Sequence, residues 1–276
     1  MFMKKLELAE IKQCGFEVLC AVEQVCRDNG IRYSLTGGTL IGAVRHQGFI
    51  PWDDDIDLMM PRPDYERFVE IVRSGDYGFD LHCRQIDGDA YWYPFAKACH
   101  RETVLKENAV KETDISLGVY VDIFPVDGAG NTAAGAKLWA MVFTFLHGLR
   151  ISANWTRYRR SKLRKWYYEP ARFMCYLLGK FIGTSALDNM IVWYLGAKAF
   201  SQSTYVGRLV GDYGSREVME AKLFREYTQV AFEGKTFLAI AEYDTFLRAL
   251  YGDYMQLPPE EKRKTHHEFE AYWVTK

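Results

Sequence analysis

Apolar positions in the first half of the chain recur alternately at helical and at strand spacing. Helical spacing from Ile11 to Val25, within a charged segment, predicts an opening helix over 4–29. Further helices are predicted from Leu40 and over 63–74. Short apolar runs predict strands at 31–35, 55–60, 79–85, 93–98 and 117–124. This alternation is typical of an α/β (α+β) fold with a mixed central sheet flanked by helices.

The pattern becomes helical from 131 to about 200, with aromatic residues at many apolar positions. We expect a helical insertion or second lobe there. Residues 233–238 predict a short hairpin or strand, and 241–251 predict a helix that ends at Gly252. The expected division is a core over 1–130, an aromatic-rich and basic insertion over 131–225, and a segment over 226–276 that completes the core domain.

Two carboxylates alternate along one predicted strand. Asp55 and Asp57 are two residues apart, and residues two apart on a strand project from the same face. Neighbouring carboxylates repel each other, and a shared proton or a bound cation such as Mg²⁺ or Mn²⁺ relieves the repulsion. An isolated D-x-D is also common in an ordinary polar turn, so the metal interpretation depends on the residues around it.

A glycine turn precedes the two carboxylates. Residues 36–39 (TGGT), which include Gly37, Gly38 and Thr39, form the predicted turn between a short strand and a helix that starts near Leu40. Glycines let backbone N–H groups approach phosphate oxygens, and a helix N-terminus favours anions. Arg45 and His46 lie at the end of the same helix, where they either contact a phosphate or are solvated cations.

The sequence GGTLIGAVRHQGFIPWDDDIDLMMPRPDYERF, over 37–68, resembles the LicD family of phosphocholine transferases, within the polymerase beta-like nucleotidyltransferase superfamily. Residues 119–128 (VYVDIFPVDG) and 251–259 (YGDYMQLPP), followed by Arg263 and His266, also resemble that family. The resemblance covers nearly the whole chain and is weakest over 131–225. The interval from Gly38 to Asp55 is longer than in the general superfamily pattern, but is similar in LicD proteins.

The resemblance implies a third metal-binding carboxylate on a neighbouring strand. Asp122 fits this place, because the residues around it alternate as in a strand. Asp127 is a competing candidate, although we expect Pro125 to end the strand before it. Lys97 resembles a lysine of LicD proteins and would neutralise a donor phosphate. The alternative for Lys97 is a solvated residue on an edge strand.

The activity implied by the resemblance is Mg²⁺-dependent transfer of phosphocholine from CDP-choline to a hydroxyl of a cell-surface glycan precursor, such as lipopolysaccharide, teichoic acid or capsule, with release of CMP. CDP-ethanolamine, CDP-glycerol and CDP-ribitol are alternative donors. Three other functions stay open: nucleotide transfer to a small molecule or protein, metal-dependent glycosyl transfer, and nucleotide sensing without catalysis.

Aromatic residues near the proposed site suggest two roles. Some of the four residues Trp52, Tyr91, Trp92 and Tyr93 could cage the quaternary ammonium of choline, since aromatic faces attract such cations. Packing in the core is the alternative for all four. His266 is either a ligand, as the resemblance suggests, or a solvated residue of a charged tail.

Overall composition favours a cytoplasmic enzyme. The net charge of −1 argues against broad nucleic-acid binding, and six cysteines without a C-x-x-C pair indicate reduced thiols. The longest apolar run, 138–149, is too short to span a bilayer. The basic and aromatic run over 150–172 is either an interfacial segment, which docks on anionic lipid at the inner membrane face or on a phosphate-rich acceptor, or a solvated helix face.

Overall fold

The computed structural model of the chain describes residues 4–107, 115–158, 160, 165–211, 213–263 and 269–274. The chain divides into two compact units, which we call unit 1 (Met1–Val126 with Glu220–Lys276) and unit 2 (Asp127–Met219). Helices and strands are mixed throughout, and the central sheet is mixed, which confirms the predicted fold class. As a division into domains, the boundaries expected at 130 and 225 stay a prediction.

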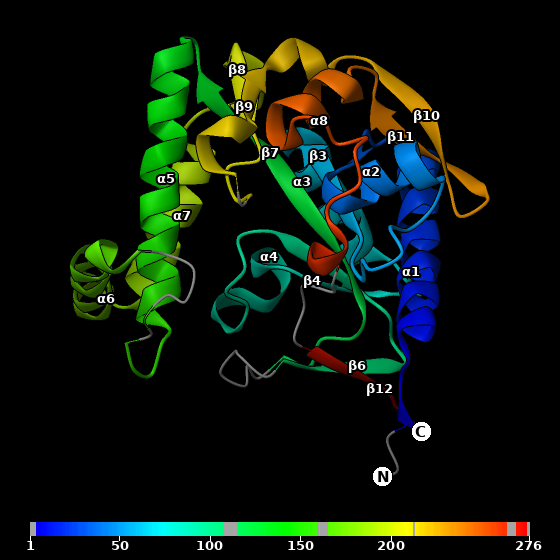
Figure 1. Cartoon of the computed structure of the whole chain (residues 1–276), viewed down its shortest axis with the longest axis horizontal. Coiled ribbons are helices and arrows are strands. Elements are labelled where there is room, and N and C mark those ends of the chain that lie inside the picture. Colours follow the sequence, from blue (N-terminus) through cyan, green and yellow to red (C-terminus); the bar gives the residue numbers. More distant parts are fainter. Residues whose placement is uncertain are drawn as a thin grey trace. The chain divides into compact units, whose positions relative to one another are not determined.

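The central sheet of unit 1 places two parallel strands side by side (Figure 1). Its strands lie in the order β2 (Ser34–Leu35), β3 (Asp57–Pro61), β7 (Tyr120–Gly130), β5 (Ala96–Cys99) and β4 (Asp80–His82). β3 and β7 are parallel, and the other neighbouring pairs are antiparallel. Leu58, Met60, Val121 and Ile123 on these two strands are fully buried, so the parallel pair forms the centre of the sheet.

Helices of unit 1 begin and end at residues that the sequence marks clearly. They include α1 (Leu8–Asn29), α2 (Gly37–His46), α3 (Arg62–Ser74), α4 (Arg84–Asp87) and α8 (Tyr243–Tyr251). A capping box between Glu7 and Glu10 begins α1, and Gly30, with φ of 59°, ends it in the left-handed region. Pro63 lies in the first turn of α3, where its missing N–H costs nothing.

Two smaller sheets complete unit 1. The hairpin of β10 (Tyr227–Phe232) and β11 (Lys235–Ile240) confirms the hairpin expected near 233–238. A three-stranded antiparallel sheet in the order β1 (Lys4–Lys5), β12 (Phe269–Trp273) and β6 (Thr103–Glu107) was not predicted. Short 3₁₀ helices cover Gly88–Ala90, Trp166–Tyr168, Phe200–Gln202, Gly214–Glu217, Ala221–Phe224 and Glu260–Lys262.

Unit 2 packs three helices together: α5 (Ala133–Ala153), α6 (Glu169–Ile182) and α7 (Thr184–Gly196). Leu149, Ala153 and Leu187 form their small apolar core. Strand β8 (Tyr205–Gly207) pairs with the last residues of β7 and with β9 (Val218–Glu220). In the part of the chain that the structure describes, no helix is both long and apolar enough to cross a bilayer.

Two expectations about strand ends were wrong. β3 begins at Asp57 rather than Asp55, because the neighbouring strand β2 gives way to α2 at Gly37 and ends the antiparallel ladder on that side. β7 also continues through Pro125 to Gly130. Pairing between β5 and β7 stops at Ile123, so the missing N–H of Pro125 breaks no hydrogen bond on that side.

Candidate active site

The glycine turn lies directly against Asp57. Gly37 has φ of 58°, and a Cβ atom built on it would lie 2.7 Å from Oδ2 of Asp57. The N–H of Thr36 donates to the carbonyl of Asp57 over 3.0 Å, and the N–H of Asp57 donates to the hydroxyl of Thr39 over 2.9 Å. Thr39 is thus buried and holds the start of β3, while glycine at position 37 leaves room for the carboxylate.

Asp122 is the lateral neighbour of Asp57. The two residues occupy paired positions of the parallel strands β3 and β7, and the N–H of Asp122 donates to the carbonyl of Ile56 over 2.8 Å. Paired positions project from the same face of a sheet, so both carboxylates lie on one face. Asp127, the competing candidate, is fully buried and pairs with Gly207. It lies an odd number of residues beyond Asp122, which directs it to the opposite face.

Lys97 binds Asp122 from the other neighbouring strand. Lys97 is paired in register with Asp122, and its Nζ donates to Oδ1 of Asp122 over 2.6 Å. The ammonium also lies 3.4 Å from the centre of the Tyr120 ring. With 2% exposure, Lys97 is not the solvated edge residue of the alternative interpretation. Contact of Lys97 with a donor phosphate stays a prediction.

The acidic loop before β3 gathers a second set of carboxylates. Oxygens of Asp53, Asp54 and Asp55 lie within 4.8 Å of one another, the spacing of a cation site. Among the described residues, this is the one group of three His, Cys, Asp or Glu side chains whose ligand atoms all lie this close together. The expected set of Asp55, Asp57 and Asp122 does not meet this distance. A Cβ atom on Gly38 would collide with Oδ2 of Asp53, so the glycine turn contacts this loop as well as Asp57.

Two residues from distant elements anchor the segment that leads to the acidic loop. Lys12 on α1 donates to the carbonyls of Ile50 and Pro51 over 3.1 and 3.0 Å. Glu233, at the turn of the β10–β11 hairpin, accepts from the N–H of Phe49 over 2.9 Å, and its own N–H donates to the carbonyl of Gln47 over 3.0 Å. Burial lowers the pKa of Lys12, while the charges of Asp53, Asp54 and Glu233 oppose this shift.

Arg45 and His46 contact protein groups rather than open solvent. Arg45 donates to the carbonyl of Tyr254 over 2.6 Å and through Nε to Nε2 of His46 over 2.9 Å. Burial lowers the pKa of Arg45. Burial and then the charge of Arg45 lower the pKa of His46, which favours the neutral imidazole. Arg45 thus ties α2 to the segment after α8, and its expected phosphate contact stays a prediction.

The aromatic residues expected to cage choline divide into two places. Tyr91, Trp92 and Tyr93 pack on one another, with 4.0 Å between the Trp92 and Tyr93 ring centres. Tyr91 is 2% exposed, and burial raises its pKa well above the ordinary value. The Trp52 ring instead lies 5.6 Å from the guanidinium of Arg263. Tyr91 therefore packs in the core, and His266 lies outside the described residues.

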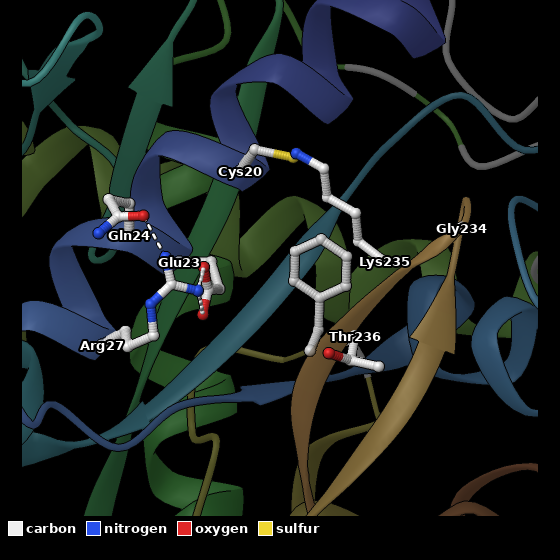
Figure 2. A pocket seen from close by; sticks show the side chains of 8 residues that line it. Cys20, Glu23, Gln24, Arg27, Gly234, Lys235 and Thr236 are labelled. Atoms are coloured by element: carbon white, nitrogen blue, oxygen red, sulfur yellow. Dashed lines mark hydrogen bonds and ion pairs between the residues drawn. The ribbon is translucent and has the colours of Figure 1, made fainter.

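A cavity of about 400 Å³ lies between α1 and β11, apart from the predicted site residues (Figure 2). Charged and polar side chains line it, and Nζ of Lys235 donates to Sγ of Cys20 over 3.2 Å. Arg27 on its wall is already paired with Glu23 over 2.9 Å. None of the predicted site residues lines this cavity, so we place the candidate active site at the glycine turn and the carboxylates of β3 and β7.

Sequence reasoning missed Asp53, Lys12 and Glu233. The run Asp53–Asp54–Asp55 was visible as three consecutive acids and offered a signal for Asp53. Lys12 and Glu233 gave none, because they act on backbone atoms far away in sequence. Together the site combines a helix N-terminus, clustered carboxylates and a buried lysine, a set that suits binding of phosphate and a divalent cation.

Comparisons with known proteins agree with this geometry. A family model for the LicD/FKTN/FKRP nucleotidyltransferase domain matches residues 30–177, which include the glycine turn, Asp57, Lys97 and Asp122. "Lipopolysaccharide cholinephosphotransferase LicD" of Haemophilus influenzae is 31% identical over 98% of this chain and 99% of its own length. Human "Ribitol 5-phosphate transferase FKRP" is 62% identical over 77 residues, which cover 26% of this chain and 15% of that protein. These matches confirm the resemblance seen in the sequence, and the chain belongs to the LicD family.

Proposed function

We propose that this transferase moves phosphocholine from CDP-choline to a hydroxyl of a cell-surface glycan precursor and releases CMP. The likeness to the Haemophilus cholinephosphotransferase, over nearly the full length of both chains, supports phosphocholine as the group transferred. The observation that carries the proposal is the contact of the glycine turn with Asp57, beside Asp122. We place the reaction in the cytoplasm, where CDP-activated alcohols and glycan precursors meet.

Mg²⁺ fits the residues present. Asp57 and Asp122 offer carboxylate oxygens on one face of the sheet, and Asp55 lies in the acidic loop directly before β3. Oxygen ligands of this kind are those that Mg²⁺ and Mn²⁺ prefer. We assign Asp55, Asp57 and Asp122 as ligands on the chemistry of their oxygens, although the three do not all lie within 4.8 Å of one another in this arrangement, with Asp53 of the acidic loop as an additional candidate. When bound, the ion neutralises charge on the phosphate oxygens.

The residues of the chain supply binding, orientation and proton transfer. Backbone N–H groups of Gly37, Gly38 and Thr39 at the start of α2 bind donor phosphate oxygens. An acceptor hydroxyl oxygen forms a bond to the phosphorus that carries choline, and the bond from this phosphorus to the CMP oxygen breaks. Asp122 takes the hydroxyl proton, and Lys97 holds its carboxylate in place.

CDP-ribitol is the second candidate donor. The observation in its favour is the 62% identity of a 77-residue segment to a ribitol 5-phosphate transferase, although that segment covers only 15% of the relative. Both donors release CMP and differ only in the alcohol that accompanies the phosphate. Nucleotide transfer, as in the wider superfamily, would instead release pyrophosphate from ATP.

A panel of CDP-choline, CDP-ethanolamine, CDP-glycerol, CDP-ribitol and ATP, each with Mg²⁺ and a lipopolysaccharide or teichoic acid acceptor, tests the proposal by phosphorus NMR. We expect CMP release and phosphocholine on the acceptor with CDP-choline, and loss of both in Asp57→Asn. Asp28→Asn, which changes an exposed carboxylate on α1, is the matched control and should stay active. Ribitol phosphate on the acceptor would favour CDP-ribitol as the donor, and no reaction with any donor would favour a nucleotide-sensing module.

A further inference from the structure

Charge is distributed very unevenly between the two units. Unit 2 contains thirteen Lys and Arg residues against five Asp and Glu residues, a formal charge of +8. Unit 1 therefore carries −9, since the whole chain has a net charge of −1. The near-neutral total conceals a strongly cationic unit, which attracts anionic surfaces.

The acids of unit 2 do little to neutralise its surface. Asp127, Asp188 and Glu217 are buried, and Glu169 is largely covered. Three of these four acids form ion pairs with arginines of the same unit: Asp188 with Arg150, Glu217 with Arg208, and Glu169 with Arg172. Within the described part of unit 2, the exposed charges are thus cationic, and they include Lys137, Arg157, Arg160, Lys165 and Lys180.

Helix α6 exposes an apolar face. Large apolar residues recur on it at helical spacing, namely Phe173, Met174, Leu177, Leu178 and Phe181. Phe181 is 89% exposed and is flanked by the exposed Lys180. Packing inside unit 2 uses other positions of the helix, including Cys175 and Ile182. A water-exposed face of this size marks a surface that binds another apolar surface.

The neighbouring elements of unit 2 expose apolar side chains as well. On α7 the largest is Trp193, which is 69% exposed, and in the 3₁₀ helix before α6 it is Trp166, which is 81% exposed and follows Lys165. On α5, Leu138, Met141 and Phe145 are spaced along one helix face and are all more than half exposed. Aromatic residues next to lysines are the composition that proteins present to the interface of a bilayer.

We propose that unit 2 docks the protein on an anionic lipid bilayer, with the exposed apolar faces of α6 and α7 entering the headgroup region. An anionic bilayer fits this surface by charge, because the exposed charges of unit 2 are cationic and an anionic leaflet attracts them. A second copy of the same face would bring two charges of +8 together, which disfavours a dimer. This docking is a function beyond phosphate transfer, and it would hold the enzyme where membrane-linked acceptors are.

The surface is wider than the segment 150–172 singled out by the sequence. Its most exposed apolar residues include Phe181 and Trp193, which lie beyond that segment, whereas 159 and 161–164 lie outside the described residues. Arg150 is buried against Asp188 and belongs to the interior of unit 2. The anionic lipid interaction is therefore assigned to helices rather than to the basic run alone.

Sedimentation of the full-length protein with vesicles tests the proposal. We expect binding to vesicles of phosphatidylcholine with 30% phosphatidylglycerol and much weaker binding to phosphatidylcholine alone. Phe181→Ser combined with Trp193→Ser should lower the partition coefficient by about tenfold or more. Lys165→Gln combined with Lys180→Gln should lower it by about fivefold for each charge, on anionic vesicles only.

A matched control changes two exposed apolar residues of unit 1, Met255→Ser with Leu257→Ser, which should leave vesicle binding unchanged. Unchanged binding of the Phe181/Trp193 variant would overturn the proposal. So would a lipid-free dimer, seen by sedimentation equilibrium, that this variant dissociates. CMP release from soluble donor should persist in the variant, so a failure of docking and a failure of the proposed phosphotransfer are measured separately.

Discussion

Gly37 combines two constraints that are separable by mutation. Its φ of 58° disfavours any side chain, and a Cβ atom there would also press on Oδ2 of Asp57. Gly30 has nearly the same φ, 59°, but has nothing within 4 Å of the equivalent Cβ position. The two glycines thus have the same backbone strain, but only Gly37 contacts the proposed site.

We expect Gly37→Ala and Gly30→Ala each to lower the free energy of unfolding by about 1–2 kcal/mol, because both force a left-handed alanine. Only Gly37→Ala should also displace the Asp57 carboxylate, with a loss of turnover of about 100-fold. Urea unfolding and CMP release measure the two effects. Equal activities in the two variants would contradict the assigned role of the glycine turn.

Lys97 and Asp122 form a buried pair whose members depend on each other. Lys97→Met should lower the free energy of unfolding by roughly 3 kcal/mol, because it leaves a largely buried carboxylate without its cation. Adding Asp122→Asn to Lys97→Met should restore part of that stability, although we expect the double variant to be inactive. Additive losses in a urea-denaturation cycle would show that the two side chains do not interact.

His46 makes stability depend on pH. Its pKa is lowered from 6.5 by burial and by Arg45, so folding favours the neutral imidazole. This contribution is complete above the unfolded-state pKa of 6.5 and is lost as pH falls through the lower, folded-state pKa. Between pH 7.5 and 5.5 the Tm of the parent should fall more than that of His46→Gln. Parallel Tm curves for the two proteins would contradict this expectation.

At the scale of elements, the hairpin β10–β11 reaches across the chain to organise the segment before the acidic loop. Glu233 has a positive φ of 49° at the hairpin turn, and its side chain and backbone hold Phe49 and Gln47. Lys12 of α1 holds the next residues, Ile50 and Pro51. A hairpin and a helix outside the proposed catalytic motifs therefore hold the segment that leads to the loop with three carboxylates.

We expect Glu233→Ala to weaken Mg²⁺ binding and to lower the free energy of unfolding by about 1 kcal/mol, since it removes one exposed charge-assisted hydrogen bond. Glu233→Gln keeps an oxygen acceptor for the N–H of Phe49 and serves as the matched control. Isothermal titration with Mg²⁺ distinguishes the two. Identical Mg²⁺ affinities for both variants would show that the hairpin does not contribute to the Mg²⁺ site.

For the whole molecule, the sequence predicted the fold class, the main helices and the strand that carries Asp122. These elements were predictable because their apolar residues recur at helix or strand spacing within a short stretch of sequence, and the site residues stand out as polar positions in that pattern. The sheet of β1, β12 and β6 was missed, since Lys4–Lys5 is too short to show any period. The contacts of Lys12 and Glu233 were missed too, because hydrogen bonds to backbone atoms leave no trace in residue type.

The reactivity of the six cysteine thiols reports how deeply each one is buried. Burial raises the pKa of Cys14 and Cys83 to about 11 and that of Cys99 to about 12, and it also raises that of Cys26. Cys20 and Cys175 are partly exposed. Iodoacetamide at pH 8 should therefore label Cys20 and Cys175 first in the native protein and all six cysteines in urea, as read by mass spectrometry. Early labelling of Cys99 would contradict the assigned burial.

The pairing of β1 with β12 has a consequence for biosynthesis. Lys4 and Lys5 pair with Trp273 and Tyr272, which lie far away in the sequence and are made much later. β12 also pairs with β6, so during synthesis the β6 edge lacks this partner until residues 269–273 have left the ribosome. Unit 1 can therefore complete its fold only after β12 has been made, and products that stall before β12 keep an open strand edge that favours aggregation.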